Sequence, residues 1–174
     1  MFLLICFTLG GAVFLAQGVD RSKPPVVTKG GFSVRQLSSL SAIDGRTWIP
    51  TSALYGGTHS SPNKQFTLTM DDDPENSGEI LRFKIYFAEK GKPRVQLNAG
   101  PATYAWISPD SRWILIAPLD VIDVRTWRRF SVPDRNGFIV IQAISKDGKR
   151  VLFTEQDCPF DCRLPNRNYE LRFP

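Results

Sequence analysis

Two segments of the chain share one sequence pattern around a turn. Residues 106–116 read WISPDSRWILI, residues 143–153 read AISKDGKRVLF, and the two segments start 37 residues apart. In each, a polar stretch with Ser and Asp separates two apolar runs. An Asp carboxylate can fold back onto the turn backbone, and Gly or Ser tolerates the unusual dihedral angles that follow. The pattern predicts two copies of a unit made of a strand, a tight turn and a second strand.

A period near 40 residues with several strands per unit is typical of β-propeller blades. The two turns resemble those of bacterial TolB-like and WD40-like propellers, in which Ser-Pro-Asp-Gly-Arg-x-Leu turns recur. Residues 119–127 resemble the third strand of such a blade and its turn into the fourth. Residues 80–97, with Glu89-Lys-Gly-Lys92 in the middle, resemble the same third and fourth strands of an earlier blade.

The resemblance covers about two and a half units, whereas closed propellers have at least about four blades. It therefore implies an open stack of two or three small antiparallel blade-like sheets, an incomplete propeller, unless a second copy or a partner closes the ring. Open sheet edges invite pairing with other chains unless they are covered or charged. We expect the basic side chains of Arg82, Lys84, Arg128 and Arg129 to protect these edges.

The rest of the chain also has a β pattern and no amphipathic helix. Apolar and polar residues alternate between breaks rich in Gly, Pro, Asn and Asp. We expect strands at residues 32–37, 66–70, 80–87, 94–97, 102–107, 112–116, 121–125, 128–132, 138–144, 150–154 and 169–173, and mostly loops at 38–64. The prediction is an all-β fold with one domain over residues 32–174.

The first 18 residues read as an export signal. Residues 2–16 are mostly apolar, no charged residue precedes Asp20, and the run is shorter than a membrane span. Small residues at Ala16 and Gly18 predict cleavage after Gly18 and a periplasmic or secreted protein. An uncleaved anchor and a buried N-terminal element remain alternatives. Residues 19–31, with two prolines and two glycines, are expected to form an extended leader.

The predicted mature chain keeps two cysteines, Cys158 and Cys162. In an oxidising compartment such a close pair indicates a small disulfide loop, and two thiolates alone cannot complete a zinc shell. The stapled loop at residues 155–168 presents Phe160 at its tip, flanked by Asp161 and Arg163. Because a rigid loop loses little entropy on binding, we expect it to contact a partner. The alternative is a loop that only covers a sheet end.

Little in the sequence indicates catalysis. The chain has one histidine, His59, which excludes multi-histidine metal sites. We expect no catalytic residues, no metal ion and no cofactor. The acidic run at residues 71–79 fails as an EF-hand because its sixth position is Asn76 and its twelfth is Arg82. We expect a solvated hairpin loop there, and calcium binding remains open.

The net charge of +5 favours steering toward an acidic partner. The basic cluster Arg125, Arg128 and Arg129 around Trp127 is a candidate contact surface. Nucleic acid is not an expected partner of an exported protein, and no membrane contact is expected after signal cleavage. Trp and Arg are the usual anchors of protein interfaces, so at least one of the four tryptophans is expected to flank a partner surface.

Taken together, the architecture and the turn at residues 145–152 resemble those of periplasmic immunity proteins against type VI secretion toxins, such as peptidoglycan amidases. That resemblance implies a non-enzymatic protein that occludes a toxin hydrolase with a loop. The alternatives are a generic envelope assembly or scaffold protein and a small secreted hydrolase that uses carboxylates. The partner-binding candidates are Phe160, Asp161, Arg163, Arg125, Trp127, Arg128 and Arg129.

Overall fold

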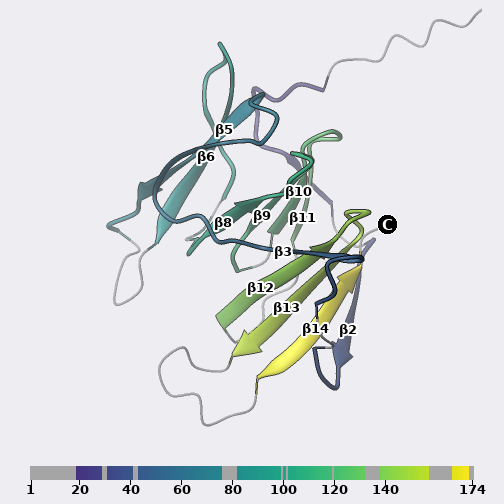
Figure 1. The fold of residues 1–174 in the computed structure, drawn as a ribbon. Coiled ribbons are helices and arrows are strands. Elements are labelled where there is room, and N and C mark those ends of the chain that lie inside the picture. The colour runs from purple at the N-terminus through teal and green to yellow at the C-terminus, as the bar shows by residue number, and fades with distance from the viewer. Residues whose placement is uncertain are drawn as a thin grey trace, which may run out of the picture.

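The computed structural model describes residues 19–28, 31–40, 43–75, 82–98, 100, 102–118, 120–131, 138–156 and 166–172. Over these residues the regular structure is entirely β, arranged in three sheets of which none closes into a barrel (Figure 1). The predicted all-β class with open sheets is confirmed. Among the described residues no helix is long and apolar enough to cross a membrane.

Each sheet is built around consecutive antiparallel strands. Sheet C has the order β4 (Gly57–Ser60), β5 (Phe66–Asp72), β6 (Phe83–Glu89) and β7 (Val95–Gln96). Sheet A continues with β8 (Ala105–Ile107), β9 (Trp113–Ile116), β10 (Asp120–Asp123) and β11 (Arg128–Ser131). Sheet B contains β12 (Phe138–Ser145), β13 (Arg150–Gln156) and β14 (Arg167–Arg172).

Three N-terminal strands complete sheets A and B. Strand β1 (Val26–Thr28) pairs parallel with β11, whereas only antiparallel pairs were predicted. Strand β2 (Ser33–Leu37) pairs antiparallel with β14, and β3 (Trp48–Pro50) pairs antiparallel with β12. Strands β3 and β4 both lie in the region predicted as loops, because their short runs lack clear alternation.

Sheet A lies between sheets C and B (Figure 1), and both of its faces are buried. Alternate residues of β9 belong to different cores. Leu115 packs in the cluster shared with sheet B, and Ile114 packs in the cluster shared with sheet C. This explains why β9 reads as a continuous apolar run rather than an alternating one.

The same turn occurs three times, once in each sheet. Ser61, Ser108 and Ser145 each place a hydroxyl on the side chain two residues later, which is Asn63, Asp110 and Asp147 in turn. Each hydroxyl also accepts an N–H bond from the residue five positions later, at 3.1, 2.8 and 2.9 Å. The position three residues after each serine has a positive φ, at Lys64 (58°), Ser111 (58°) and Gly148 (71°).

This third turn was not predicted. The turn at Ser61 makes β4 and β5 the counterparts of the strands on either side of Ser108. Residues 80–97 were assigned to the third and fourth strands of an earlier blade, and β6 and β7 are the third and fourth strands of sheet C. The assignment of residues 119–127 to a third strand and its turn is confirmed by β10 and β11. Three units are therefore present.

The edge prediction is wrong. Lys84 lies on β6, between β5 and β7, and Arg128 and Arg129 lie on β11, between β10 and β1. Arg82 directly precedes β6. The strand predicted at 94–97 covers β6 as β7, and β1, which was not predicted, covers β11.

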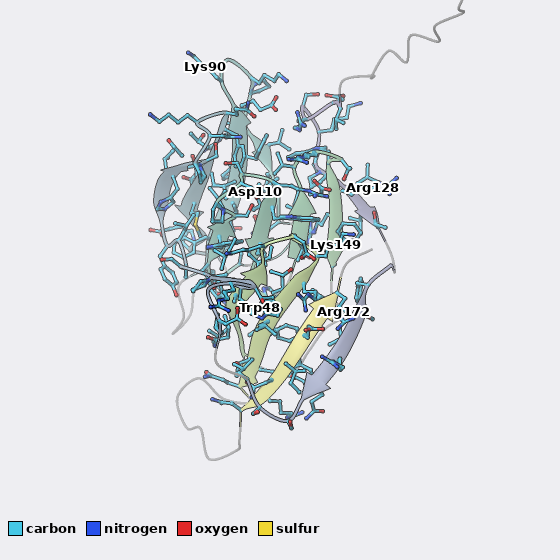
Figure 2. All side chains as sticks on the ribbon, turned by 45° about the vertical axis from the view of Figure 1, so that its right-hand side comes forward. Trp48, Lys90, Asp110, Arg128, Lys149 and Arg172 are labelled. Atoms are coloured by element: carbon cyan, nitrogen blue, oxygen red, sulfur yellow. The ribbon has the colours of Figure 1, made fainter. Side chains whose placement is uncertain are left out.

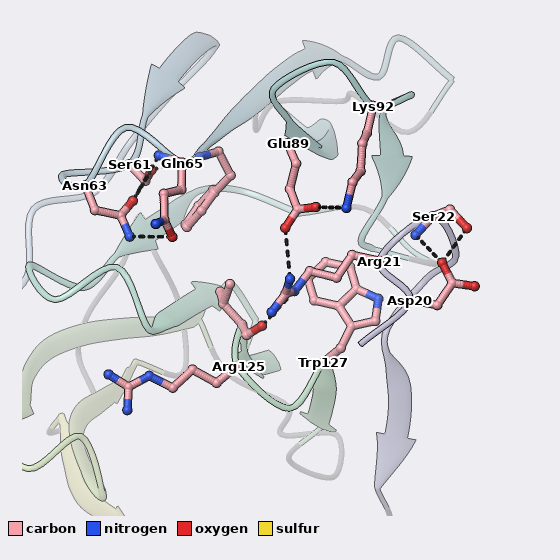
Figure 3. A network of polar contacts seen from close by, with 12 residues as sticks. Asp20, Arg21, Ser22, Ser61, Asn63, Gln65, Glu89, Lys92, Arg125 and Trp127 are labelled. Atoms are coloured by element: carbon pink, nitrogen blue, oxygen red, sulfur yellow. Dashed lines mark hydrogen bonds and ion pairs between the residues drawn. The ribbon is translucent and has the colours of Figure 1, made fainter. Parts of the chain in front are cut away.

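The segment predicted to be an extended leader packs against two sheets (Figure 3). The Arg21 guanidinium donates to Glu89 of sheet C and to the carbonyl oxygen of Val124 of sheet A, both at 2.9 Å. The Trp127 indole donates to the carbonyl oxygen of Lys23 at 2.7 Å. Partial burial raises the pKa of Glu89, but the hydrogen bond from Lys92 and the charge of Arg21 outweigh it, so this pKa lies below its usual value.

Candidate functional site

The sheets stack in the order C, A, B, and equivalent faces of the sheets point in the same direction along the stack. The residue seven positions after the turn serine of each sheet lies on this face. Leu68 of sheet C packs toward sheet A, and Leu115 of sheet A packs toward sheet B. The matching residue of sheet B is Leu152, which is buried but belongs to neither of the two core clusters, while its neighbours Val151 and Phe153 pack toward sheet A. This face of sheet B is therefore the end of the stack.

We call this surface the outer face of sheet B. It comprises the side chains that lie opposite one another across β2, β14, β13, β12 and β3 on the side away from sheet A. The residues that matter below are Arg35, Trp48, Arg150, Leu152, Glu170 and Arg172.

Three arginines surround one carboxylate on this face. The Glu170 side chain is 6% exposed, and Arg172 donates to it at 2.6 Å. The guanidinium nitrogens of Arg35 and Arg150 lie 3.6 and 3.8 Å from its oxygens. The pairing registers bring these residues together, because Glu170 lies opposite Arg35 on β2 and next to Arg172 along β14. The cluster carries a surplus of two positive charges.

Trp48 adds an aromatic ring to the same face. The Arg150 guanidinium lies over this ring, 4.9 Å from its centre, which is cation–π geometry. The turn before Trp48 is held by Asp44, whose carboxylate accepts from the backbone N–H groups of Arg46 and Thr47. The hydrogen bond from the Thr47 N–H lowers the pKa of Asp44. Figure 2 shows Trp48, Lys149 and Arg172 on sheet B.

Trp48 is the tryptophan that flanks a surface. Trp106, Trp113 and Trp127 are at most 5% exposed, whereas Trp48 is half-buried. The sequence analysis did not single it out, although a signal exists. Residues 44–48 read DGRTW and residues 123–127 read DVRTW, and both turns use the Asp in the same way. Only the placement of the two turns in the fold separates a core tryptophan from a surface one.

On the outer face of sheet C, at the other end of the stack, each basic group has its own acidic partners. Arg94 lies over the Tyr86 ring, 4.1 Å from its centre, and pairs with Asp71 at 2.9 Å. Lys84 pairs with Asp73 at 3.5 Å and with Glu75 at 3.8 Å. Three carboxylates thus face two basic groups here. These acids belong to the run predicted as a solvated hairpin loop, of which residues 76–79 lie outside the described residues.

The predicted basic cluster is divided by the fold. Arg125 and Arg128 are exposed. Trp127 is 3% exposed and packs on the Phe87 ring, 4.7 Å between centres. Arg129 pairs with Asp120 and donates to a backbone carbonyl oxygen at 2.9 Å. Trp127 and Arg129 therefore stabilise the fold, and the pair left at the surface is Arg125 and Arg128.

The predicted binding loop falls on residues outside the described ranges: Cys158, Phe160, Asp161, Cys162 and Arg163. The ends of the loop are described, at the last residue of β13 and the first of β14. Arg150 and Arg172 lie at the opposite ends of these two strands. Strands rise about 3.3 Å per residue, so the loop starts roughly 20 Å from Arg150 and roughly 10 Å from Glu170.

In the described part of the chain, neither the single histidine nor a group of metal-ligating side chains forms a site. His59 is half-buried on β4, and its Nε2 lies 2.7 Å from the carbonyl oxygen of Gly56. No group of three or more His, Cys, Asp or Glu side chains among the described residues could hold a metal ion.

Comparisons with protein-family models, with curated proteins and with solved structures found no match for this chain.

Proposed function

We propose that this protein is an exported, non-enzymatic protein-binding module that contacts its partner through the outer face of sheet B. The observation that carries the proposal is the cluster of Arg35, Arg150 and Arg172 around Glu170, beside Trp48. Trp and Arg are the side chains on which protein interfaces most often depend. Here they are gathered on a sheet face that no following sheet covers in the part of the chain that the structure describes.

The face is built to bind without much loss of entropy. Its side chains project from paired strands, and Glu170 and Trp48 hold the Arg150 guanidinium from two sides. A side chain already ordered in the free protein costs less to immobilise at an interface. The arrangement suits recognition of a partner surface by a few fixed anchors.

Export remains part of the proposal and has its own test. Intact-mass measurement of protein recovered from the envelope should give a chain that begins at Val19, with Cys158 and Cys162 oxidised. A full-length mass, or two reactive thiols, would contradict this part.

The partner-binding surface is tested by affinity capture from envelope extract with three baits. Wild type and the variant Tyr86→Ala/Arg94→Ala should retain the same partner, because the second bait changes only the outer face of sheet C. The matched variant Trp48→Ala/Arg150→Ala should lose it. Retention by all three baits would exclude this face as the contact surface and return attention to the loop around Phe160 or to Arg125 and Arg128.

The class of partner stays a prediction. A toxin hydrolase identified by mass spectrometry among the captured proteins would support an immunity function, and an envelope structural protein would support the scaffold alternative. A loop plug and a face contact lie at opposite ends of β13, so the baits also separate these two modes of binding.

A further inference from the structure

We propose that the outer face of sheet B binds an acidic protein segment, whose carboxylates pair with Arg35, Arg150 and Arg172. This inference rests on the proposed function and names the chemistry of the partner. It follows from the imbalance of charge in the cluster, the free donor geometry of two arginines and the charge of the adjoining turns.

The cluster offers more positive charge than its own carboxylate can neutralise. The side chains of Arg35, Arg172 and Arg150 are 64%, 53% and 31% exposed, while that of Glu170 is 6% exposed. A partner therefore meets the guanidinium groups and not the acid beneath them. Carboxylates are their natural complement, because planar guanidinium groups can bind them through two parallel hydrogen bonds.

Glu170 holds these arginines near one another without saturating them. Its oxygens lie 3.6 and 3.8 Å from Arg35 and Arg150, which is ion-pair range but too long for a hydrogen bond. Each guanidinium has five N–H donors. Donors of both arginines thus remain for a carboxylate of the partner.

The neighbouring turns add to the positive field. Lys146 and Lys149 are exposed in the turn that leads to Arg150, and Arg46 is exposed in the turn before Trp48. Asp44 and Asp147 in the same turns stay ionised and offset two of these charges, so the turns add one net positive charge. The Ser145 hydroxyl and the Lys149 N–H lower the pKa of Asp147 by bonding its carboxylate.

A second copy of this chain fits less well. The matching face for a head-to-tail contact is the outer face of sheet C, where Thr67 and Thr69 occupy positions that are Ile114 and Ile116 in sheet A. Its acids are already paired with Lys84 and Arg94. Such a polar end face is typical of a capped stack rather than a subunit interface.

The test uses a fluorescein-labelled peptide of alternating glutamate and glycine, with fluorescence anisotropy as the readout. Wild type should bind it, and the affinity should fall as salt rises. The variant Arg35→Ala/Arg150→Ala should bind about tenfold more weakly or worse. The variant Arg125→Ala/Arg128→Ala removes the same charge from another surface and should bind like wild type. Arg35→Ala alone, at the most exposed arginine, covers the case in which the double variant misfolds.

Three results would overturn the inference: equal binding of a lysine–glycine peptide, equal weakening by both double variants, or no peptide binding by a folded wild type. A dimer in light scattering that dissociates in the Arg35→Ala/Arg150→Ala variant would assign the face to a second copy. If capture from envelope extract still depends on Trp48 and Arg150 while the glutamate peptide fails, the acidic chemistry is wrong and the binding function stands.

Discussion

Both end faces of the stack have an arginine over an aromatic ring, but the charges around the two arginines differ. On sheet C, Arg94 lies over Tyr86 and has Asp71 as its own partner. On sheet B, Arg150 lies over Trp48 but shares Glu170 with two other arginines. An arginine on an aromatic ring is therefore not by itself a binding signal in this molecule. The supply of carboxylates differs between the ends: the acids outnumber the basic groups on sheet C, and the arginines outnumber the acid on sheet B.

A second difference separates these end faces from the interior. Where a next sheet follows, the fifth and seventh positions after the turn serine are Phe66 and Leu68, or Trp113 and Leu115. At the end of the stack the fifth position becomes Arg150. The turn and the pairing register are repeated in the three sheets. The side chains on the face that points along the stack differ according to whether another sheet covers them.

The largest effect is expected from a comparison of Leu115, in the interior of the stack, with Leu152, on its end face. The two positions should differ in how much a truncation lowers the free energy of unfolding. Leu115→Ala should cost about 2–5 kcal/mol of unfolding free energy, because it leaves a cavity between two sheets. Leu152→Ala should cost at least about 1 kcal/mol less, since no second sheet encloses the vacated space. Denaturant titrations of both variants measure this difference, and equal costs would mean that the outer face is covered.

A substitution at Gly148 tests whether the inner face of sheet B packs against sheet A. A Cβ atom at this position would lie 2.1 Å from the Trp113 indole nitrogen, and the φ of 71° disfavours any side chain. Gly148→Ala should therefore destabilise the protein by about 2–4 kcal/mol, from backbone strain and overpacking together. Gly45→Ala is the control, because nothing lies within 4 Å of its Cβ position. Similar melting temperatures of the two variants would contradict the stacking.

Tyr104 allows the contact between sheets A and B to be tested through the pH dependence of stability. Its hydroxyl donates to the Ile139 carbonyl oxygen at 2.8 Å and accepts from the Ile141 N–H at 2.9 Å. Tyr104→Phe should cost about 1–3 kcal/mol, since it leaves these buried groups unpaired. Burial raises the pKa of Tyr104 to about 12 from 10.0. Because the folded state favours the neutral phenol, its contribution is complete below pH 10 and is lost as the pH rises toward 12.

Alkaline denaturation measures this contribution directly. Wild type should lose stability more steeply than Tyr104→Phe between pH 10 and 12. Parallel curves for the two proteins would show that the hydroxyl is not buried between the sheets.

The smallest effect on stability is expected at the end faces themselves. Trp48→Ala/Arg150→Ala and Tyr86→Ala/Arg94→Ala each remove a cation–π pair at a partly exposed site, worth about 0.5–1 kcal/mol plus some packing. Both variants should melt cooperatively and within a few degrees of wild type. A collapse of the sheet B variant alone would mean that Trp48 is needed for folding, so its loss of binding would no longer identify a contact surface.

The sequence predicted the features that local chemistry determines. Alternation and turn residues gave the all-β class and most strands, and the Ser-x-Asp pattern located the turns at Ser108 and Ser145. The third turn was missed because it has Asn63 in place of Asp and Lys64 in place of Gly or Ser. The parallel strand β1 and the edge strand β3 were missed because their partners lie about 100 residues away.

The candidate site was beyond sequence reasoning for a related reason. Arg35, Arg150 and Arg172 come from three strands and meet only through the pairing of β2, β14 and β13. Trp48 and Trp127 occupy near-identical pentapeptides, and no local rule states that one is covered by Phe87 and the other borders an end face.

Hydroxyl-radical footprinting of the protein, free and in envelope extract, tests the central claim most directly. The readouts are the oxidation of Trp48 on the outer face of sheet B, Tyr86 on that of sheet C, and Phe160 in the loop predicted to contain a disulfide. The account predicts that the extract protects Trp48 and leaves the labelling of Tyr86 and Phe160 unchanged. Protection of Tyr86 or Phe160, with Trp48 labelled as in the free protein, would contradict it.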